Sequence, residues 1–155
     1  MKKLLKLMDE HGYYFPSANN YSVGKVVDVT NALGYPVVLN AIVDQLNTII
    51  PSDVEGLVSA TPKGTVLAST LASRHGYQHT TIKEEANGWA NRIVGAMPSR
   101  DSNLVYIDTV FHEKTDFYNL HQFVVEPLNS YLDHAYVLQK EEEKDIGIPV
   151  TALFK

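Results

Sequence analysis

Apolar residues recur along this chain with two periods, one typical of helices and one typical of buried strands. In residues 1–12 they gather on one side of a helical wheel, which predicts an amphipathic first helix. Its inward-facing side chains are expected to be Leu4, Leu5, Leu7 and Met8. Pro36 stands where a second helix can begin, and residues 37–50 keep apolar positions three to four apart. Further strands are expected at 25–30, 54–59, 79–82, 103–107, 135–139 and 150–154, and further helices at 65–75 and 117–128.

Strands and helices therefore alternate along the sequence. Such alternation is typical of α/β proteins, in which helices cover a sheet of parallel strands. We expect one α/β domain over residues 1–155, with a mainly parallel twisted sheet flanked by helices on both faces. Gly76 is a plausible cap for the helix at 65–75, and the residues around Thr61-Pro62-Lys63-Gly64 are expected to form a loop. Residues 84–95 are polar at first, with little periodicity, and are expected to form a loop.

Composition narrows the function classes. A chain of 155 residues with 45% hydrophobic residues is long enough for one ordinary hydrophobic core. With no cysteine, it has neither a disulfide framework nor a thiolate zinc site. A net charge of −5 and the lack of a Lys/Arg stripe argue against nucleic-acid binding. No run approaches the roughly 20 apolar residues of a membrane span, and the apolar start is too short for a signal peptide, so we expect a cytoplasmic protein.

The stretch NLVYID, residues 103–108, carries the strongest hint of chemistry. An apolar strand ends there in Asp108, and open α/β sheets place ligand-contacting groups at the carboxyl ends of their strands. A phosphate-binding loop, rich in Gly, Ser and Thr, would be expected to follow. Residues 111–116 instead read Phe-His-Glu-Lys-Thr-Asp, with no glycine and two acids.

Several motifs together resemble the orotate phosphoribosyltransferases, which are type I phosphoribosyltransferases. The motifs are KVVDVT at 25–30 followed by Pro36, ATPKG at 60–64, VLASTLASRHG at 66–76 and GIPVTALFK at 147–155. Their order and spacing cover almost the whole chain. The resemblance implies the type I phosphoribosyltransferase fold and a homodimer. It also implies transfer of phosphoribose from phosphoribosyl pyrophosphate to a base, with Mg²⁺ carried by the pyrophosphate substrate. In such enzymes residues 1–24 would form the N-terminal helix and a substrate hood, and 84–95 a mobile flap.

The same resemblance assigns roles to individual residues. Lys63 and Gly64 fall in the pyrophosphate turn, Asp108 keeps the first of two acids that hold the ribose hydroxyls and Mg²⁺, and Thr109 replaces the second. Lys114 and Thr115 fall in the loop that wraps the 5′-phosphate. The two remaining basic positions, candidates for the leaving pyrophosphate and the orotate carboxylate, are Lys83 in the flap and Lys140. Asp108 and Lys83 are the candidate catalytic residues.

Three of these regions depart from the family pattern. Side chains replace the glycines that let a backbone close on phosphate, and Glu113 and Asp116 would repel a phosphate dianion. In the flap, acidic and amide residues, Glu84 and Asn87, take the places of basic ones, and Lys140 lacks the bidentate fork of arginine. The sequence therefore predicts weakened or lost catalysis, with a homodimer that binds a nucleotide, a phosphoribosyl ligand or a protein partner. The alternative is an active transferase with a divergent phosphate loop; without a surviving phosphoribosyl pyrophosphate site, no cofactor is expected.

Other residues have ordinary structural explanations beside the functional ones. Lys63 and Gly64 could mark a turn alone, and Asp108 could cap the segment that follows it. His75 and His79 are four apart, but Gly76 between them is expected to end a helix, so a shared metal is not expected. The same holds for the pair at 112–113. Trp89, the only tryptophan, is either a half-buried anchor or a contact for a ligand or partner.

Overall fold

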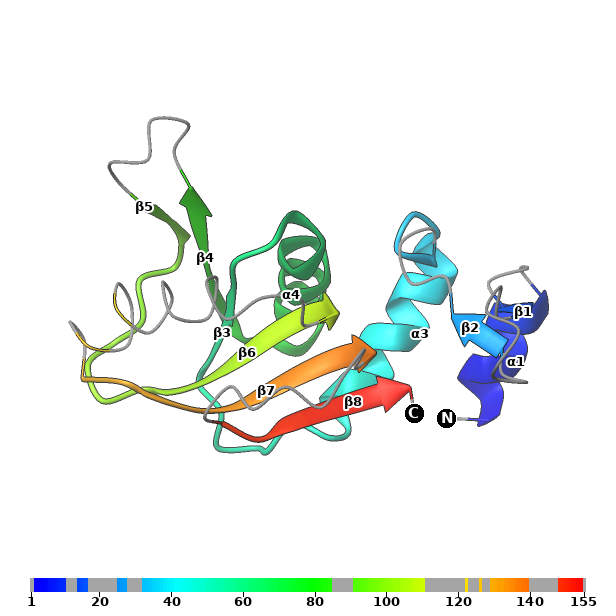
Figure 1. The fold of residues 1–155 in the computed structure, drawn as a ribbon. Helices are drawn as coiled ribbons and strands as arrows, with labels where there is room; N and C mark the ends of the chain where they lie inside the picture. The colour runs from blue at the N-terminus through cyan, green and yellow to red at the C-terminus, as the bar shows by residue number, and fades with distance from the viewer. Residues whose placement is uncertain are drawn as a thin grey trace.

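The computed structural model describes residues 2–10, 14–16, 25–27, 32–84, 91–110, 122, 126, 129–139 and 148–154. Its helices are α1 (Lys2–Glu10), α3 (Pro36–Asn47) and α4 (Pro62–His75). Its strands are β1 (Tyr14–Pro16), β2 (Lys25–Val27), β3 (Gly56–Ser59), β4 (Gln78–Glu84), β5 (Asn91–Gly95), β6 (Asn103–Val110), β7 (Tyr131–Gln139) and β8 (Val150–Phe154) (Figure 1). Among the described residues, no helix has both the length and the apolar character needed to cross a membrane.

The larger sheet has six strands in the order β5-β4-β3-β6-β7-β8. Every neighbouring pair from β4 to β8 is parallel, and only β5 runs antiparallel to its neighbour. The prediction of an α/β domain with a mainly parallel sheet is thus confirmed. The strand expected at 25–30 does not join this sheet: its described part, β2, pairs antiparallel with β1, a strand that the sequence did not indicate. This small sheet lies beside α1, away from the larger one (Figure 1).

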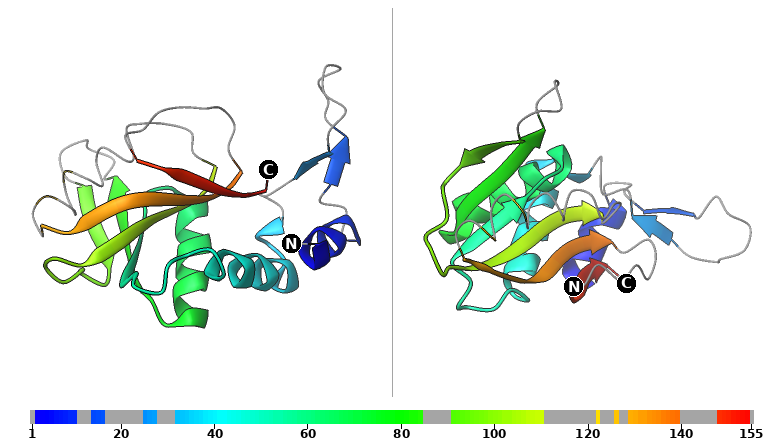
Figure 2. Two further views of the ribbon diagram at one scale, coloured as in Figure 1. Left: turned by 90° about the horizontal axis from the view of Figure 1, so that it is seen from below. Right: turned by 60° about the vertical axis from the view of Figure 1, so that its left-hand side comes forward.

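The described helices lie on one face of the larger sheet, with α3 and α4 packed side by side and α1 against α3 (Figure 2). The main core forms there, between the helices and the side chains that alternate strands turn toward them. Its fully buried members include Met8, Ile42, Leu67 and Ile107. Leu4 and Met8 are buried and Leu5 and Leu7 partly buried, as the amphipathic pattern predicts. The helix expected at 117–128 lies outside the described residues.

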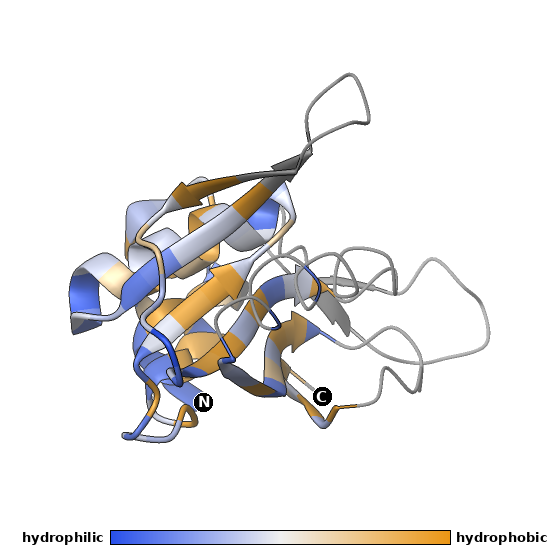
Figure 3. Ribbon diagram, turned by 90° about the vertical axis from the view of Figure 1, so that its left-hand side faces the viewer, coloured by the Kyte–Doolittle hydropathy of each residue, from blue (hydrophilic) through white to orange (hydrophobic). Residues whose placement is uncertain are grey.

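A second cluster of apolar side chains occupies the opposite face of the sheet. It contains Val58, Tyr106 and Ala135, one from each of the three central strands. Hydrophobic residues are prominent on these strands in Figure 3, because central strands of parallel sheets are buried on both faces. A register shift between β6 and β7 falls between Leu104 and Tyr106.

Two element boundaries differ from the sequence-based expectation in ways that affect the candidate site. The turn expected around residues 61–64 is mostly helical, because α4 begins at Pro62 with Thr61 as its N-cap. Proline fits the first position of a helix, since its missing N–H would have no partner there. Strand β6 continues to Val110, so Asp108 and Thr109 lie within the strand and not after it. The end of α4 agrees with expectation, because Gly76 caps it with φ of 83°.

The described residues of the loop expected at 84–95 belong to strands. Glu84 is the last residue of β4, and residues 91–95 form β5, which pairs with β4 in a regular antiparallel register. Residues 85–90 lie outside the described part of the chain. At the end of β5 Gly95 has φ of 103°, and a Cβ there would lie 2.4 Å from the carbonyl oxygen of His79. Only glycine fits that position, which fixes where β5 diverges from β4.

Candidate functional site

The candidate site lies where β3 and β6 reach the carboxyl edge of the sheet and α4 begins. The parallel pairing of β3 with β6 brings the end of β3 beside Asp108. The chain then turns from β3 through Ala60 and Thr61 into α4. This is the position at which open α/β sheets bind ligands, at the start of a helix whose N–H groups point outward.

Asp108 is the central residue of the site, and it is almost fully buried, with 2% of its surface exposed. Its Oδ1 accepts hydrogen bonds from the Thr61 hydroxyl at 2.8 Å and from the Thr109 backbone N–H at 2.6 Å. Its Oδ2 accepts one from the Tyr106 hydroxyl at 2.8 Å. Both carboxylate oxygens thus have partners within the protein, on β6 itself and on the turn before α4.

Burial raises the pKa of the Asp108 carboxyl above its usual value, because the ionised form loses water as a partner. The hydrogen bonds from Tyr106, Thr61 and Thr109 act in the opposite direction and offset part of this rise. Short hydrogen bonds from these three donors therefore hold the carboxylate in place within the fold. Oδ1 accepts two of these hydrogen bonds and Oδ2 accepts one, and the residue is closed to solvent, so a ribose hydroxyl would reach it only if neighbouring groups moved.

Thr61 and Gly64 join this carboxylate to α4. The Thr61 hydroxyl donates to Asp108 and its oxygen accepts the Gly64 N–H at 2.9 Å, which caps the helix. A Cβ at Gly64 would lie 2.9 Å from the Ile107 carbonyl oxygen and 3.0 Å from Asp108 Oδ1. Helix α4 thus approaches β6 so closely that a side chain does not fit between them. Gly64 is buried because of this contact. The sequence had suggested either a place in the pyrophosphate turn or a turn alone for this residue.

A second polar group lies between α4 and the sheet, on strands β3 and β4. We call it the hydroxyl chain: Ser59, Thr65, Thr81 and His79. Ser59 Oγ is 3.1 Å from Thr65 Oγ1 and 2.9 Å from His79 Nε2. Thr65 Oγ1 is 2.9 Å from Thr81 Oγ1, and the Thr81 hydroxyl donates to the Ser59 carbonyl at 3.0 Å. Ser59 itself is fully buried.

Sequence reasoning missed the hydroxyl chain, although the spacing of two of its residues pointed to it. His79 and Thr81 alternate along β4, so their side chains share one face of the strand. Parallel pairing then sets Ser59 opposite Thr81. The missing information was which face of β4 turns toward α4.

The remaining predicted site residues are only partly within the described structure. Lys63 is exposed on the first turn of α4, and Thr109 is buried beside Asp108. The backbone of Lys83 lies in β4, but its side chain is not among those described. Three predicted ligand-binding residues, Lys114, Thr115 and Lys140, lie outside the described residues, as do Trp89 and the pair at 112–113.

His75 and His79 have different partners. His75 Nε2 lies 3.0 Å from Asp44 on α3, and the same carboxylate receives a bidentate contact from Arg74. His79 belongs to the hydroxyl chain. No group of three or more His, Asp or Glu residues suited to a metal occurs within the described ranges.

Magnesium prefers oxygen ligands, and Asp108 is the carboxylate that the sequence suggested for it. Both Asp108 oxygens, however, face hydroxyl or N–H donors. Asp108 is also almost fully buried, which gives a hydrated cation no access to its oxygens, so the described residues of the site do not fit Mg²⁺ in this arrangement.

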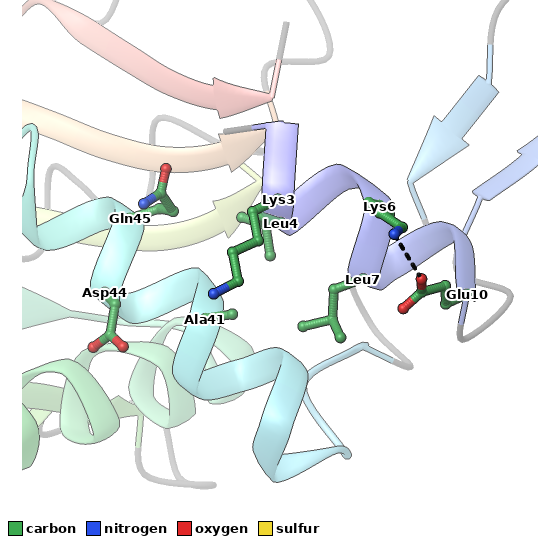
Figure 4. A pocket seen from close by; sticks show the side chains of 8 residues that line it. All are labelled: Lys3, Leu4, Lys6, Leu7, Glu10, Ala41, Asp44 and Gln45. Atoms are coloured by element: carbon green, nitrogen blue, oxygen red, sulfur yellow. Dashed lines mark ion pairs between the residues drawn. The ribbon is translucent and has the colours of Figure 1, made fainter.

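Two hollows of the described surface lie elsewhere. One of about 430 Å³ lies between α1 and α3, with Lys3, Lys6, Asp44 and Gln45 at its walls (Figure 4). The other, of about 610 Å³, lies near the amino ends of the strands, beside Glu55, Tyr77 and Ser102. Neither includes Asp108, Thr61 or Gly64. The candidate site rests on topology and hydrogen bonding, and not on a described cavity.

Comparison with known proteins identifies the fold. A scan against protein-family models and a search of curated protein sequences found no match. Among solved structures, an orotate phosphoribosyltransferase from Aeropyrum pernix is similar with a TM-score of 0.70 and 18% identity, over 95% of this chain and 90% of the other. An adenine phosphoribosyltransferase from Thermoanaerobacter pseudethanolicus has a TM-score of 0.68 and 15% identity, over 97% and 98%. The adenine phosphoribosyltransferase from Saccharomyces cerevisiae, complexed with an imino-altritol bisphosphate and adenine, has a TM-score of 0.68 and 13% identity. The match covers 99% of this chain and 100% of the other.

Proposed function

We propose that this chain, which has the fold of the type I phosphoribosyltransferases, binds a small phosphorylated ligand such as a nucleotide or phosphoribosyl compound without efficient transfer. The observation that carries the proposal is the state of Asp108. Its carboxylate is 2% exposed, and internal donors occupy both of its oxygens. An acid that must hold ribose hydroxyls or a Mg²⁺-bound substrate needs at least one oxygen facing the ligand.

The departures of the sequence from the family pattern support the same proposal. A transferase stabilises the departing pyrophosphate and the positive charge on the ribose with positioned groups and a metal. Removing one such group commonly lowers the rate by about a hundred- to a thousandfold. Here Thr109 replaces the second acid and the glycines of the phosphate loop are replaced. Of the basic positions that the family has in and next to the flap, only the one at Lys83 keeps its charge. Several losses of this size together would leave little turnover.

The same family likeness leads us to propose a cytoplasmic homodimer, with no nucleic-acid or membrane partner. Sedimentation of the purified protein would give twice the monomer mass if the dimer forms. Mg²⁺ would accompany the ligand only if that ligand carries a pyrophosphate.

An active transferase is the second candidate. The capped start of α4, with Lys63 exposed on it, still stands beside Asp108 at the carboxyl edge of the sheet. A rearrangement that swaps the Thr61 or Tyr106 hydroxyl for a ribose hydroxyl would restore one contact of the site. Because similar folds include both adenine and orotate enzymes, both bases belong in the test.

Isothermal titration with phosphoribosyl pyrophosphate and Mg²⁺, with and without adenine or orotate, separates the two candidates. We expect no release of pyrophosphate, and binding of ribose 5-phosphate or a nucleoside monophosphate. Micromolar binding of phosphoribosyl pyrophosphate with turnover, both lost in Asp108→Asn, would establish the transferase instead. Asp101→Asn is the matched control, because Asp101 is exposed on the turn before β6, whereas Asp108 lies near the other end of that strand. If no phosphorylated ligand binds, the proposal fails and protein partners become the alternative.

A further inference from the structure

The hydroxyl chain contains a serine and a histidine at a spacing that suggests catalysis. Ser59 Oγ and His79 Nε2 are 2.9 Å apart, within the range of a nucleophile and its general base. In such a pair the serine donates its proton to an unprotonated nitrogen. The direction of the hydrogen bonds in the rest of the chain decides whether Ser59 has a proton to donate.

The chain ends at an atom that can only accept. The Thr81 hydroxyl donates its single proton to the Ser59 carbonyl oxygen. In the contact between Thr65 and Thr81, the donor must then be Thr65, at 2.9 Å. Thr65 has now used its own proton.

The same count continues to the histidine. In the contact between Ser59 and Thr65 the donor must be Ser59, at 3.1 Å. Ser59 therefore has no proton left for the imidazole, and its oxygen accepts in the remaining contact. The donor there is an N–H at Nε2 of His79, which leaves Nδ1 without a proton in the neutral ring.

We infer that His79 is a positioning residue: its Nε2–H closes a one-way chain of hydrogen bonds that fixes the end of β3 and the first turn of α4. The chain runs from His79 to Ser59, Thr65 and Thr81 and returns to the Ser59 carbonyl. That carbonyl directly precedes the turn in which Thr61 caps α4 and contacts Asp108. His79 thus acts on the candidate site through Ser59, and Ser59 is not a nucleophile.

Burial of the ring is consistent with this role. Burial lowers the pKa of the His79 imidazole, which favours the neutral form. Protonation would in any case occur at Nδ1, so the Nε2–H donor would persist. The chain therefore does not depend on the charge of the ring.

Nitrogen NMR tests the direction of the chain. Because Nε2–H is also the common tautomer of a free imidazole, the decisive signal is a slowly exchanging Nε2 proton assigned to His79. We expect this proton in the wild type, and in Thr70→Val. Thr70 is the matched control. It lies on α4, as Thr65 does, but its hydroxyl donates to the Val66 carbonyl of that helix.

Ser59→Ala removes the acceptor, and we expect the protected Nε2 proton to disappear in that variant. In Thr81→Val the chain loses its fixed end, so Ser59 is free to donate to His79 and the tautomers should mix. A proton on Nδ1 in the wild type, or an unchanged spectrum in both variants, would overturn the inference. Labelling of Ser59 by a fluorophosphonate would do the same.

Thermal unfolding gives a second readout, with rescue by a residue that can donate from a similar position. Loss of one net hydrogen bond should lower the melting temperature of His79→Leu by about 2–4 °C. His79→Gln should recover most of this loss, because its side-chain amide donates from a comparable reach. Equal melting temperatures for the two variants would contradict the positioning role.

The inference rests on the proposed function only where it concerns ligand binding at the candidate site. The NMR and melting results do not require a bound ligand, so they stand even if no phosphorylated ligand binds. Where ribose 5-phosphate does bind, His79→Leu should weaken its affinity and His79→Gln should restore it.

Discussion

The Tyr106 hydroxyl donates to Asp108 across 2.8 Å, from two residues earlier on the same strand and the same face. Strand β6 therefore carries a donor for its own buried acid. Together with the Thr61 hydroxyl and the Thr109 N–H, this donor satisfies the carboxylate from three directions. Asp108, which the family resemblance marks as a candidate catalytic residue, thus connects β6 to the start of α4 by hydrogen bonds.

Replacement of Asp108 should therefore affect stability before it affects binding. In Asp108→Ala three donors lose their acceptor in a buried place, and we expect the free energy of unfolding to fall by about 3 kcal/mol. Asp108→Asn keeps one acceptor oxygen and should cost about 1 kcal/mol. Urea unfolding measures both, and equal losses for the two variants would show that the hydrogen bonds contribute little.

The difference in stability between wild type and Asp108→Asn should depend on pH, because the pKa of Asp108 is raised in the folded protein. The unfolded chain releases this proton near 3.8, while the folded protein holds it to a higher pH. Between these two values the folded state binds more protons, so the contribution of Asp108 to stability falls as the pH rises. The advantage of wild type over Asp108→Asn should accordingly be largest in acid and shrink toward neutral pH. An advantage that grows with pH in urea titrations would contradict the raised pKa.

Gly64→Ala tests the close approach of α4 to β6. The new Cβ would meet a carbonyl oxygen and two side-chain oxygens at about 3 Å, and overpacking of this kind costs about 1–3 kcal/mol. Gly76→Ala is the matched control at the other end of the helix: its Cβ has open space, but its φ of 83° strains alanine by about 1 kcal/mol. Circular dichroism melts would then place Gly64→Ala below the control. The opposite order would mean that α4 can shift away from β6.

Asp44→Asn tests the contact between α3 and α4. Burial alone would raise the pKa of the Asp44 carboxyl, but the hydrogen bonds and charge of Arg74, with those of His75, lower it overall. The contribution of Asp44 to stability is thus present above pH 3.8. It is lost as the pH falls through the lower pKa of the folded state. Because the side chain is 43% exposed, we expect a loss of only about 0.5–1 kcal/mol at neutral pH. Glu10→Gln, in the exposed pair with Lys6, should change stability less.

The fold was predictable from the sequence because its elements repeat simple patterns. The alternation of strands and helices gave the parallel sheet, and Pro36 and Gly76 marked helix ends that the structure confirms. The departures have local causes. Pro62 and the Thr61 cap start α4 one turn early, and β6 runs past Asp108 because Tyr106 and Thr109 satisfy that acid inside the strand. In a sequence, a charged residue after an apolar run usually indicates the end of a buried strand. No sequence pattern shows which hydrogen-bond donors would let it stay inside the strand.

The candidate site was predictable in position but not in chemistry. Asp108, Thr109, Lys63 and Gly64 do lie near one edge of the sheet, as the motifs indicate. The internal partners of Asp108 and the hydroxyl chain depend on which strand faces meet, and this follows only from the three-dimensional pairing of β3, β4 and β6.

The tight junction at Gly64 also limits what can be concluded from sequence likeness to transferases. Packing against Ile107 and Asp108 demands a glycine here whether or not a phosphate ever binds. A chain that had lost its chemistry would keep this glycine, because losing it would unsettle the helix. Installing transfer activity by design would therefore leave the start of α4 as it stands and rebuild the segment beyond Thr109.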